Sequence, residues 1–230
     1  MSERPKQKHQ LTWLSLDADG STWFEAQLEL PSCRVLFASE NAVAQKLSEI
    51  LQVAQQLQPN FLAKDTALSV TTELTFPRKW GLGTSSTLIY NIAQWAQVNP
   101  FQLQFATFGG SGYDIACAGA KGAILYQKLS EMTASRAINF HPNFRHALYF
   151  VYLGKKQNSR EGIARYREKV SHSPHLIYQA TAYTHALLRA NTLEEFEFIL
   201  QQHEHLVANT LALTPTQQLY FRTTGGRLSR

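Results

Sequence analysis

The chain has 230 residues, of which 44% are hydrophobic and 17% are charged, and its formal net charge is +5. This composition allows a globular protein with a substantial core and excludes an intrinsically disordered chain. It contains no run of about 18 apolar residues, and the polar residues 1–10 lack the apolar stretch of a secretory signal. We therefore expect a cytoplasmic protein without a membrane partner.

The positive charge favours anionic ligands in general. Because the basic residues are scattered and no RNA-binding motif or basic helix accompanies them, a phosphorylated small molecule accounts for the charge equally well, and no nucleic-acid partner is expected. Two cysteines, Cys33 and Cys117, lie far apart without metal-type spacing. They are predicted to be buried thiols in a reducing compartment.

The first part of the chain alternates strand and helix patterns. Apolar and polar residues alternate over residues 11–30 around an Asp-Ala-Asp-Gly turn, which predicts a β-hairpin. Apolar residues at helical spacing predict an amphipathic helix over residues 41–58. Residues 68–76 alternate again and predict a strand.

The middle of the chain is predicted to be mainly helical. A helix is expected over residues 84–97, and Asn99 followed by Pro100 is typical of the start of another short helix. Residues 115–118 suggest one helical turn, and residues 122–127 a buried strand.

Residues 128–143 form the best candidate for a domain boundary. After it we expect an apolar strand and then three helices, over residues 147–153, 159–170, 173–190 and 192–209. Thr192 and Glu195 have the spacing of a capping box at the start of the last helix.

Two glycine-rich turns provide the strongest functional signal. The first, at residues 81–86, reads Gly-Leu-Gly-Thr-Ser-Ser, and the second, at residues 109–114, reads Gly-Gly-Ser-Gly-Tyr-Asp. A glycine turn that runs into a helix presents unpaired backbone N–H groups and the positive end of the helix dipole to an anion. Both turns therefore predict phosphate binding.

Three commoner glycine motifs fit poorly. The first turn lacks the third glycine of a dinucleotide fingerprint, and no Gly-Lys-Ser/Thr follows Gly81 at P-loop spacing. The second turn has Tyr113 where a nucleophile elbow requires glycine.

With Pro77 four residues before Gly81, the first turn resembles the central motif of the GHMP kinases, named for galactokinase, homoserine kinase, mevalonate kinase and phosphomevalonate kinase. The second turn resembles the Ser-Gly-x-Asp element of the mevalonate-type branch. Residues 112–116, Gly-Tyr-Asp-Ile-Ala, are similar to a bacterial subgroup of that family. The two motifs in this order are more specific than either one alone.

The resemblance implies that the first turn binds ATP and Mg²⁺. Ser85 matches the family hydroxyl that lies near the metal ion and the phosphates. The open alternative is an ordinary glycine-rich connection between strand and helix, with Ser and Thr capping. The nucleotide-binding residues implied are Gly81, Leu82, Gly83, Thr84, Ser85 and Ser86.

For the second turn, the resemblance implies that Asp114 is the catalytic base and that Gly110, Ser111 and Gly112 bind substrate. The apolar residues after Asp114 suggest a tight, partly dry loop, in which the acid could take a proton from a substrate hydroxyl as the γ-phosphoryl group moves. An aspartate at a helix start is also a common N-cap, and this alternative stays open.

A third element is the basic loop that ends in Ser159 and Arg160, which resembles the family's Ser/Thr-Lys loop. These two residues could hold an anionic group of the substrate or the transferring phosphate. The alternative is a solvated loop with an ordinary N-cap.

The family pattern is incomplete in this chain. Residues 1–10 do not match the family's opening strand and Leu-x-Gly-Glu element, no late glycine-rich loop is recognised, and Leu103 falls where mevalonate kinases have a Mg²⁺-binding Glu. We therefore expect an α+β, two-domain GHMP kinase-like fold that is truncated at both ends. Residues 1–130 would form the ATP-binding N-terminal-type domain, and residues 140–230 a partial C-terminal-type domain.

The function implied is ATP-dependent phosphorylation of a small-molecule alcohol, with mevalonate-like alcohols favoured over galactose and homoserine. One alternative is a catalytically incomplete fragment or paralogue that at most binds nucleotide. Another is an RNA-associated α/β domain, because the family's N-terminal domain shares its topology with domains of ribosomal proteins and translation factors.

Overall fold

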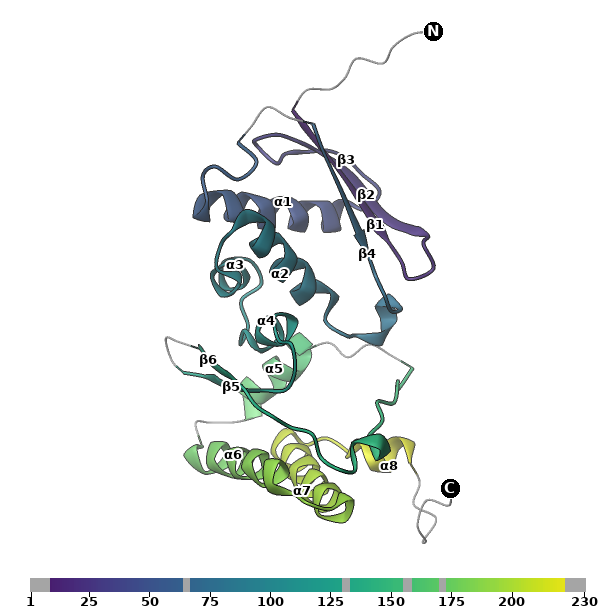
Figure 1. Ribbon diagram of the computed structural model, residues 1–230, viewed down its shortest axis with the longest axis vertical. Coiled ribbons are helices and arrows are strands. Elements are labelled where there is room, and N and C mark those ends of the chain that lie inside the picture. The colour runs from purple at the N-terminus through teal and green to yellow at the C-terminus, as the bar shows by residue number, and fades with distance from the viewer. Residues whose placement is uncertain (1–8, 64–66, 130–132, 155–158, 170–172, 222–230) are drawn as a thin grey trace. The chain divides into compact units, whose positions relative to one another are not determined.

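The computed structural model describes residues 9–63, 67–129, 133–154, 159–169 and 173–221 (Figure 1). It contains 50% helix and 18% strand, so the chain has the mixed helix and strand content predicted from the sequence. The chain divides into two units, Met1–Asn139 and Phe140–Arg230, and each is described by itself.

The predicted hairpin is present as strands β1 (Gln10–Leu16) and β2 (Thr22–Glu29), which pair antiparallel. Its turn is closed by hydrogen bonds from the amide of Asp17 to the carbonyl of Ser21 and from the amide of Gly20 to the carbonyl of Asp17. Gly20 has a φ of +80°, a left-handed conformation in which a residue with a side chain would be strained. The Asp-Gly signal therefore located the turn correctly.

Two further strands complete the first sheet. β3 (Val35–Ala38) pairs antiparallel with β2, and β4 (Leu68–Glu73) pairs parallel with β1, which gives the order β3-β2-β1-β4. The strand predicted over residues 68–76 is confirmed and ends slightly earlier. β3 was not predicted because it has only four residues.

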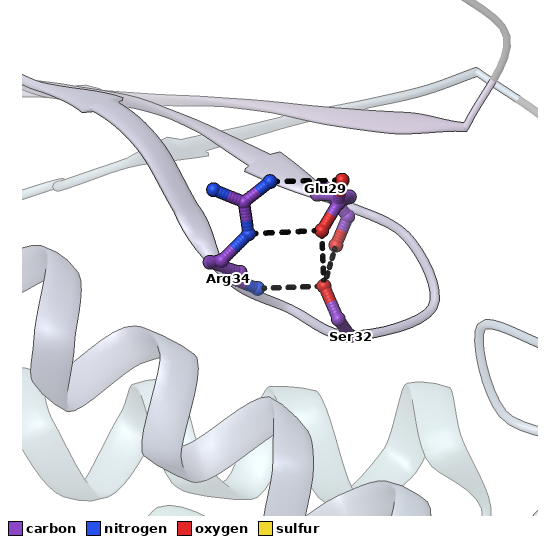
Figure 2. Close-up of polar contacts among 3 residues, drawn as sticks. All are labelled: Glu29, Ser32 and Arg34. Carbon is purple, nitrogen blue, oxygen red and sulfur yellow. Dashed lines mark hydrogen bonds and ion pairs between the residues drawn. The ribbon is translucent and has the colours of Figure 1, made fainter.

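Polar contacts hold the connection between β2 and β3 (Figure 2). The Arg34 guanidinium donates to both carboxylate oxygens of Glu29 at 3.0 Å, and the Ser32 hydroxyl donates to the same carboxylate at 2.9 Å. The hydrogen bonds from Arg34 and then from Ser32 lower the pKa of Glu29. The exposed connection is thus ordered by a charged pair.

Four helices belong to the same unit: α1 (Asn41–Leu57), α2 (Thr84–Ala96), α3 (Pro100–Thr107) and α4 (Tyr113–Ala118). α1 lies across one face of the sheet (Figure 1). Apolar side chains of these helices and of β1 and β2 form one buried core. The largest fully buried side chains of this core include Leu11, Phe24, Leu28, Ile50, Leu51, Ile89, Ile92, Leu103 and Ile115.

A two-stranded antiparallel ribbon follows α4. It consists of β5 (Ile124–Lys128) and β6 (Thr133–Ala137), with Tyr126 opposite Ser135. The sequence predicted a buried strand at residues 122–127. A strand is present there, but none of its residues is buried, because its single partner strand leaves one side of the ribbon open.

The second unit contains helices in its described part. They are η2 (Arg145–Ala147), α5 (Ser159–Lys169), α6 (Pro174–Arg189), α7 (Leu193–Leu211) and α8 (Thr216–Tyr220). α7 packs against both α5 and α6, so the three long helices predicted here are confirmed. Within the portion of the chain that was searched, no helix combines the length and the apolar character needed to cross a bilayer.

The prediction of a strand over residues 147–153 is wrong. η2 ends at Ala147, and the residues after it form no strand. Tyr149 is 81% exposed and Phe150 is 104% exposed. Apolar composition alone does not make a strand, because backbone groups need a partner strand, and the described residues of the second unit contain none.

Candidate functional site

The first glycine turn connects β4 to α2 through the short helix η1 (Arg78–Trp80). Gly81 has a φ of +74° and Gly83 a φ of +82°, so both occupy the left-handed region that favours glycine. Thr84 is the first residue of α2, and no side chain caps this end of the helix. The backbone amides of the first turn of α2 therefore remain available to a ligand.

The hydroxyl groups of this turn have different partners. The Ser86 hydroxyl is buried and donates to the carbonyl of Gly83 at 2.8 Å, and the Thr87 hydroxyl donates to the same oxygen at 3.0 Å. Ser85 is exposed, and its hydroxyl has no hydrogen-bond partner among the residues described. Of the predicted nucleotide-binding residues, Ser86 thus shapes the turn, whereas Ser85 is free to meet a ligand.

An ion pair anchors the chain just before this turn. Arg78 Nε lies 2.6 Å from Asp17 Oδ1, and the guanidinium carbon lies 4.6 Å from the centroid of the Trp23 ring. The pair links η1 to the β1–β2 hairpin. Sequence reasoning missed it, because Asp17 and Arg78 are 61 positions apart and the only sequence signal is their opposite charge.

The second glycine turn lies between α3 and α4. Gly109, Gly110 and Gly112 have φ values of +67°, +89° and +82°. The Ser111 hydroxyl accepts a hydrogen bond from the amide of Tyr113 at 3.2 Å, which links the turn to the first residue of α4. The N-cap position considered for Asp114 is occupied by Gly112, and Asp114 lies inside the first turn of α4.

Two side chains of β5 hold the carbonyl groups of this turn. The Tyr126 hydroxyl donates to the Ser111 carbonyl at 2.5 Å, and the Lys128 ammonium donates to the Gly110 carbonyl at 2.9 Å. Sequence reasoning missed both residues. Their spacing of two on a strand places them on one face, but the sequence does not show that this face meets the turn.

Asp114 is the second residue of α4 and is exposed. The expectation of a partly dry surrounding is therefore wrong, because the apolar residues after it turn inward with the helix, and Ile115 and Ala116 are buried instead. An exposed carboxylate is within reach of a bound alcohol.

The two cysteines differ. Cys33 is buried as predicted, and burial raises the pKa of its thiol to about 11. Cys117 is exposed, so the prediction of burial is wrong for this residue, which lies one turn after Asp114 on the same face of α4. A hydrogen bond with Cys117, followed by burial, raises the pKa of Tyr113.

Helices α2 and α4 pack against each other, and this brings the elements that follow the two turns into one cluster. Ile89 and Ile115 are both buried in the same core. At Gly119, a β-carbon would lie 2.6 Å from the ring of Tyr90, so the end of α4 approaches α2 closely. The core thus determines how the two helices meet.

The remaining predicted residues have other surroundings. Ser159 and Arg160 are the first two residues of α5, and their side chains lie outside the described part of the chain. Leu103 is fully buried in the core, which accounts for an apolar residue at that position.

The residues present fit a magnesium ion only in part. Within the described ranges, no group of three or more His, Cys, Asp or Glu side chains is placed to hold a metal. Mg²⁺ keeps several waters and binds substrate phosphates together with few protein ligands. The exposed Ser85 hydroxyl is suited to be one such ligand.

A cavity of about 330 Å³ lies at the other end of α2. Its lining includes Phe61, together with Trp95 and Ala96 at the end of α2 and the C-cap residue Gln97. Since α2 has 13 residues, it is about 20 Å long, and the cavity is separated from the first glycine turn by that length. The cavity is not part of the candidate site.

No family model matches the chain, and comparison with curated proteins and with solved structures gave no significant match.

Proposed function

We propose that the chain is a GHMP-type kinase, which transfers the γ-phosphoryl group of ATP to a small-molecule alcohol such as a mevalonate-like compound. One observation carries the proposal. Two left-handed glycine turns run into helices α2 and α4, and these helices pack against each other. A cytoplasmic location and a two-domain GHMP-like arrangement, with residues 140–230 as the C-terminal-type domain, are parts of the same proposal.

In this proposal the first turn holds the phosphates of ATP. Gly81 and Gly83 let the backbone approach phosphate oxygens closely, and the start of α2 favours negative charge. Ser85 would be a ligand of Mg²⁺, which neutralises charge on the transferring group. The exposure of Ser85 and its lack of a partner among the described residues support this role.

Asp114 would accept the proton of the substrate hydroxyl while the alcohol oxygen bonds to the γ-phosphorus and ADP leaves. The second turn, at Gly110 to Gly112, would bind the substrate beside it. Ser159 and Arg160 would hold an anionic group of the substrate.

A second candidate function is nucleotide binding without phosphoryl transfer. The exposure of Asp114 favours it, because a carboxylate in water is not held in the surroundings that make an effective general base. Both candidates require the first turn to bind ATP, and they differ only in the chemical step.

The first experiment measures hydrogen exchange of the full chain with and without millimolar Mg-ATP. We expect protection in residues 81–88, together with weaker Mg²⁺-dependent ATP binding in Ser85→Ala. The matched control is Thr87→Ala, which removes a hydroxyl from the same helix that already donates to Gly83. Unchanged exchange in residues 81–88 would eliminate both candidate functions.

The second experiment follows phosphoryl transfer from labelled ATP to mevalonate and related alcohols. Asp114→Asn should lower turnover by about 10² to 10⁴ and leave ATP affinity nearly unchanged, because proton removal is separate from nucleotide binding. Cys117→Ser changes the same exposed face of α4 without removing the acid and serves as the control. Binding of ATP without transfer to any alcohol would favour the second candidate.

A further inference from the structure

We propose that Tyr126 and Lys128 are positioning residues that set the orientation of the second glycine turn and of the Asp114 that follows it. This inference rests on the proposed function, in which that turn binds the substrate. Neither residue belongs to the motifs recognised in the sequence. Both lie on β5, which packs against α4 (Figure 1).

The first argument is the hydrogen bonding of two consecutive peptide groups. The Gly110 carbonyl accepts from the Lys128 ammonium, and the Ser111 carbonyl accepts from the Tyr126 hydroxyl. Because side chains two apart on a strand point to the same side, one face of β5 supplies both donors. Two adjacent carbonyls are thereby directed towards the same strand.

Peptide planarity then sets the direction of the neighbouring amides. In a trans peptide, the C=O of one residue and the N–H of the next point in opposite directions. The carbonyls of Gly110 and Ser111 point to β5, so the amides of Ser111 and Gly112 point away from it. The two donors on β5 thus fix the direction of both amides.

The second argument is the packing around Gly112. A β-carbon there would lie 2.9 Å from the Tyr126 hydroxyl and 3.1 Å and 3.2 Å from the rings of Phe105 and Phe101. The Lys128 ammonium lies 5.8 Å from the centroid of the Phe105 ring, so α3 also contacts the second donor. These contacts around the second turn, which we call the clamp, are therefore built from three elements: α3, β5 and the turn itself.

The chemistry of the two donors suits this role. Burial raises the pKa of Tyr126, so its hydroxyl keeps its proton and remains a donor at neutral pH. The Tyr113 ring meets the Tyr126 ring at 5.7 Å in an edge-to-face arrangement, which links the residue before Asp114 to the same clamp. A displacement of Tyr126 would therefore also move Tyr113 and, with it, the adjacent Asp114.

The test measures hydrogen exchange of the full chain in residues 109–118 for Tyr126→Phe and Lys128→Met. Each variant removes a donor and keeps most of the side-chain volume. We expect exchange in this segment to become about tenfold faster, since one carbonyl loses its partner. Gln127→Met on the opposite side of β5, and Lys128→Arg, which keeps a donor, should leave exchange unchanged. Unchanged exchange in both test variants would overturn the inference, as would equal acceleration throughout residues 9–129.

Phosphoryl transfer from Mg-ATP to the alcohols above separates positioning from a purely structural role. We expect kcat to fall about tenfold in both test variants with KM for ATP unchanged. Lys128→Arg should keep the kcat of the wild-type chain. Faster exchange with unchanged kcat would show a structural role and overturn the positioning role. An inactive wild-type chain would contradict the kinase proposal and with it the role in catalysis, whereas the exchange experiment would still decide whether the two residues hold the turn.

Discussion

The Tyr126 hydroxyl occupies the space that a side chain on Gly112 would need, 2.9 Å from the position of its β-carbon. Gly112 also has a φ of +82°. Two separate constraints, backbone conformation and packing, thus require glycine at this position. The second turn keeps its shape because β5 and α3 close around it.

Gly112→Ala should destabilise the chain more than Gly110→Ala. Both alanines would adopt a left-handed conformation at a cost of about 1–2 kcal/mol, but a β-carbon at Gly110 meets open space. Overpacking at Gly112 should lower the free energy of unfolding by about 1–3 kcal/mol more. Urea unfolding of the two variants measures the difference, and equal destabilisation would contradict the packing around Tyr126.

The two thiols should react at very different rates. Cys117 is exposed, whereas Cys33 is buried with its pKa raised to about 11, so little reactive thiolate is present at neutral pH. We expect a disulfide reagent to modify one thiol per native chain, and the second only after unfolding. Cys117→Ser should abolish the fast reaction. Rapid modification of two thiols in the native chain would show that Cys33 is accessible.

Asn99 should be a stabilising cap of α3. Its side-chain oxygen accepts hydrogen bonds from the amides of Phe101 at 2.9 Å and Gln102 at 3.3 Å. Asn99→Ala should lower the free energy of unfolding by about 0.5–2 kcal/mol, and Asn99→Asp, which keeps an acceptor, should lower it far less. Thermal or urea unfolding tests the pair. Equal stability of the two variants would show that the cap contributes nothing.

The contacts of Glu29 should make stability depend on pH. Hydrogen bonds from Arg34 and Ser32 place the pKa of Glu29 in the folded chain below its ordinary value of 4.5. The ionised form therefore stabilises the fold fully above the unfolded pKa, and this contribution disappears as the pH falls through the folded pKa.

We expect wild type to be more stable than Glu29→Gln at neutral pH, with the difference shrinking below pH 4.5. Urea unfolding across this range measures it. In an Arg34→Met background most of the pH-dependent difference should vanish, because Arg34 is the first cause of the shift. A difference that grows as the pH falls would contradict the assignment.

Several parts of the fold follow from local sequence because neighbouring residues determine them. The alternation around Asp17 to Gly20 predicted the hairpin, and helical spacing predicted α1. Asn99 and Pro100 marked the start of α3 through contacts within one turn of helix. Glycine at positions 83 and 112 permits the left-handed conformations found there.

Tertiary structure decided the features that depend on distant partners. The apolar residues 147–153 form no strand, and Cys117 and Asp114 face solvent although apolar residues follow Asp114 in the sequence. The carbonyls of the second turn are held by Tyr126 and Lys128, which lie 15 and 18 residues further along the chain. Residue type and spacing determine which face of a helix or strand is apolar, but only the path of the whole chain determines what that face meets.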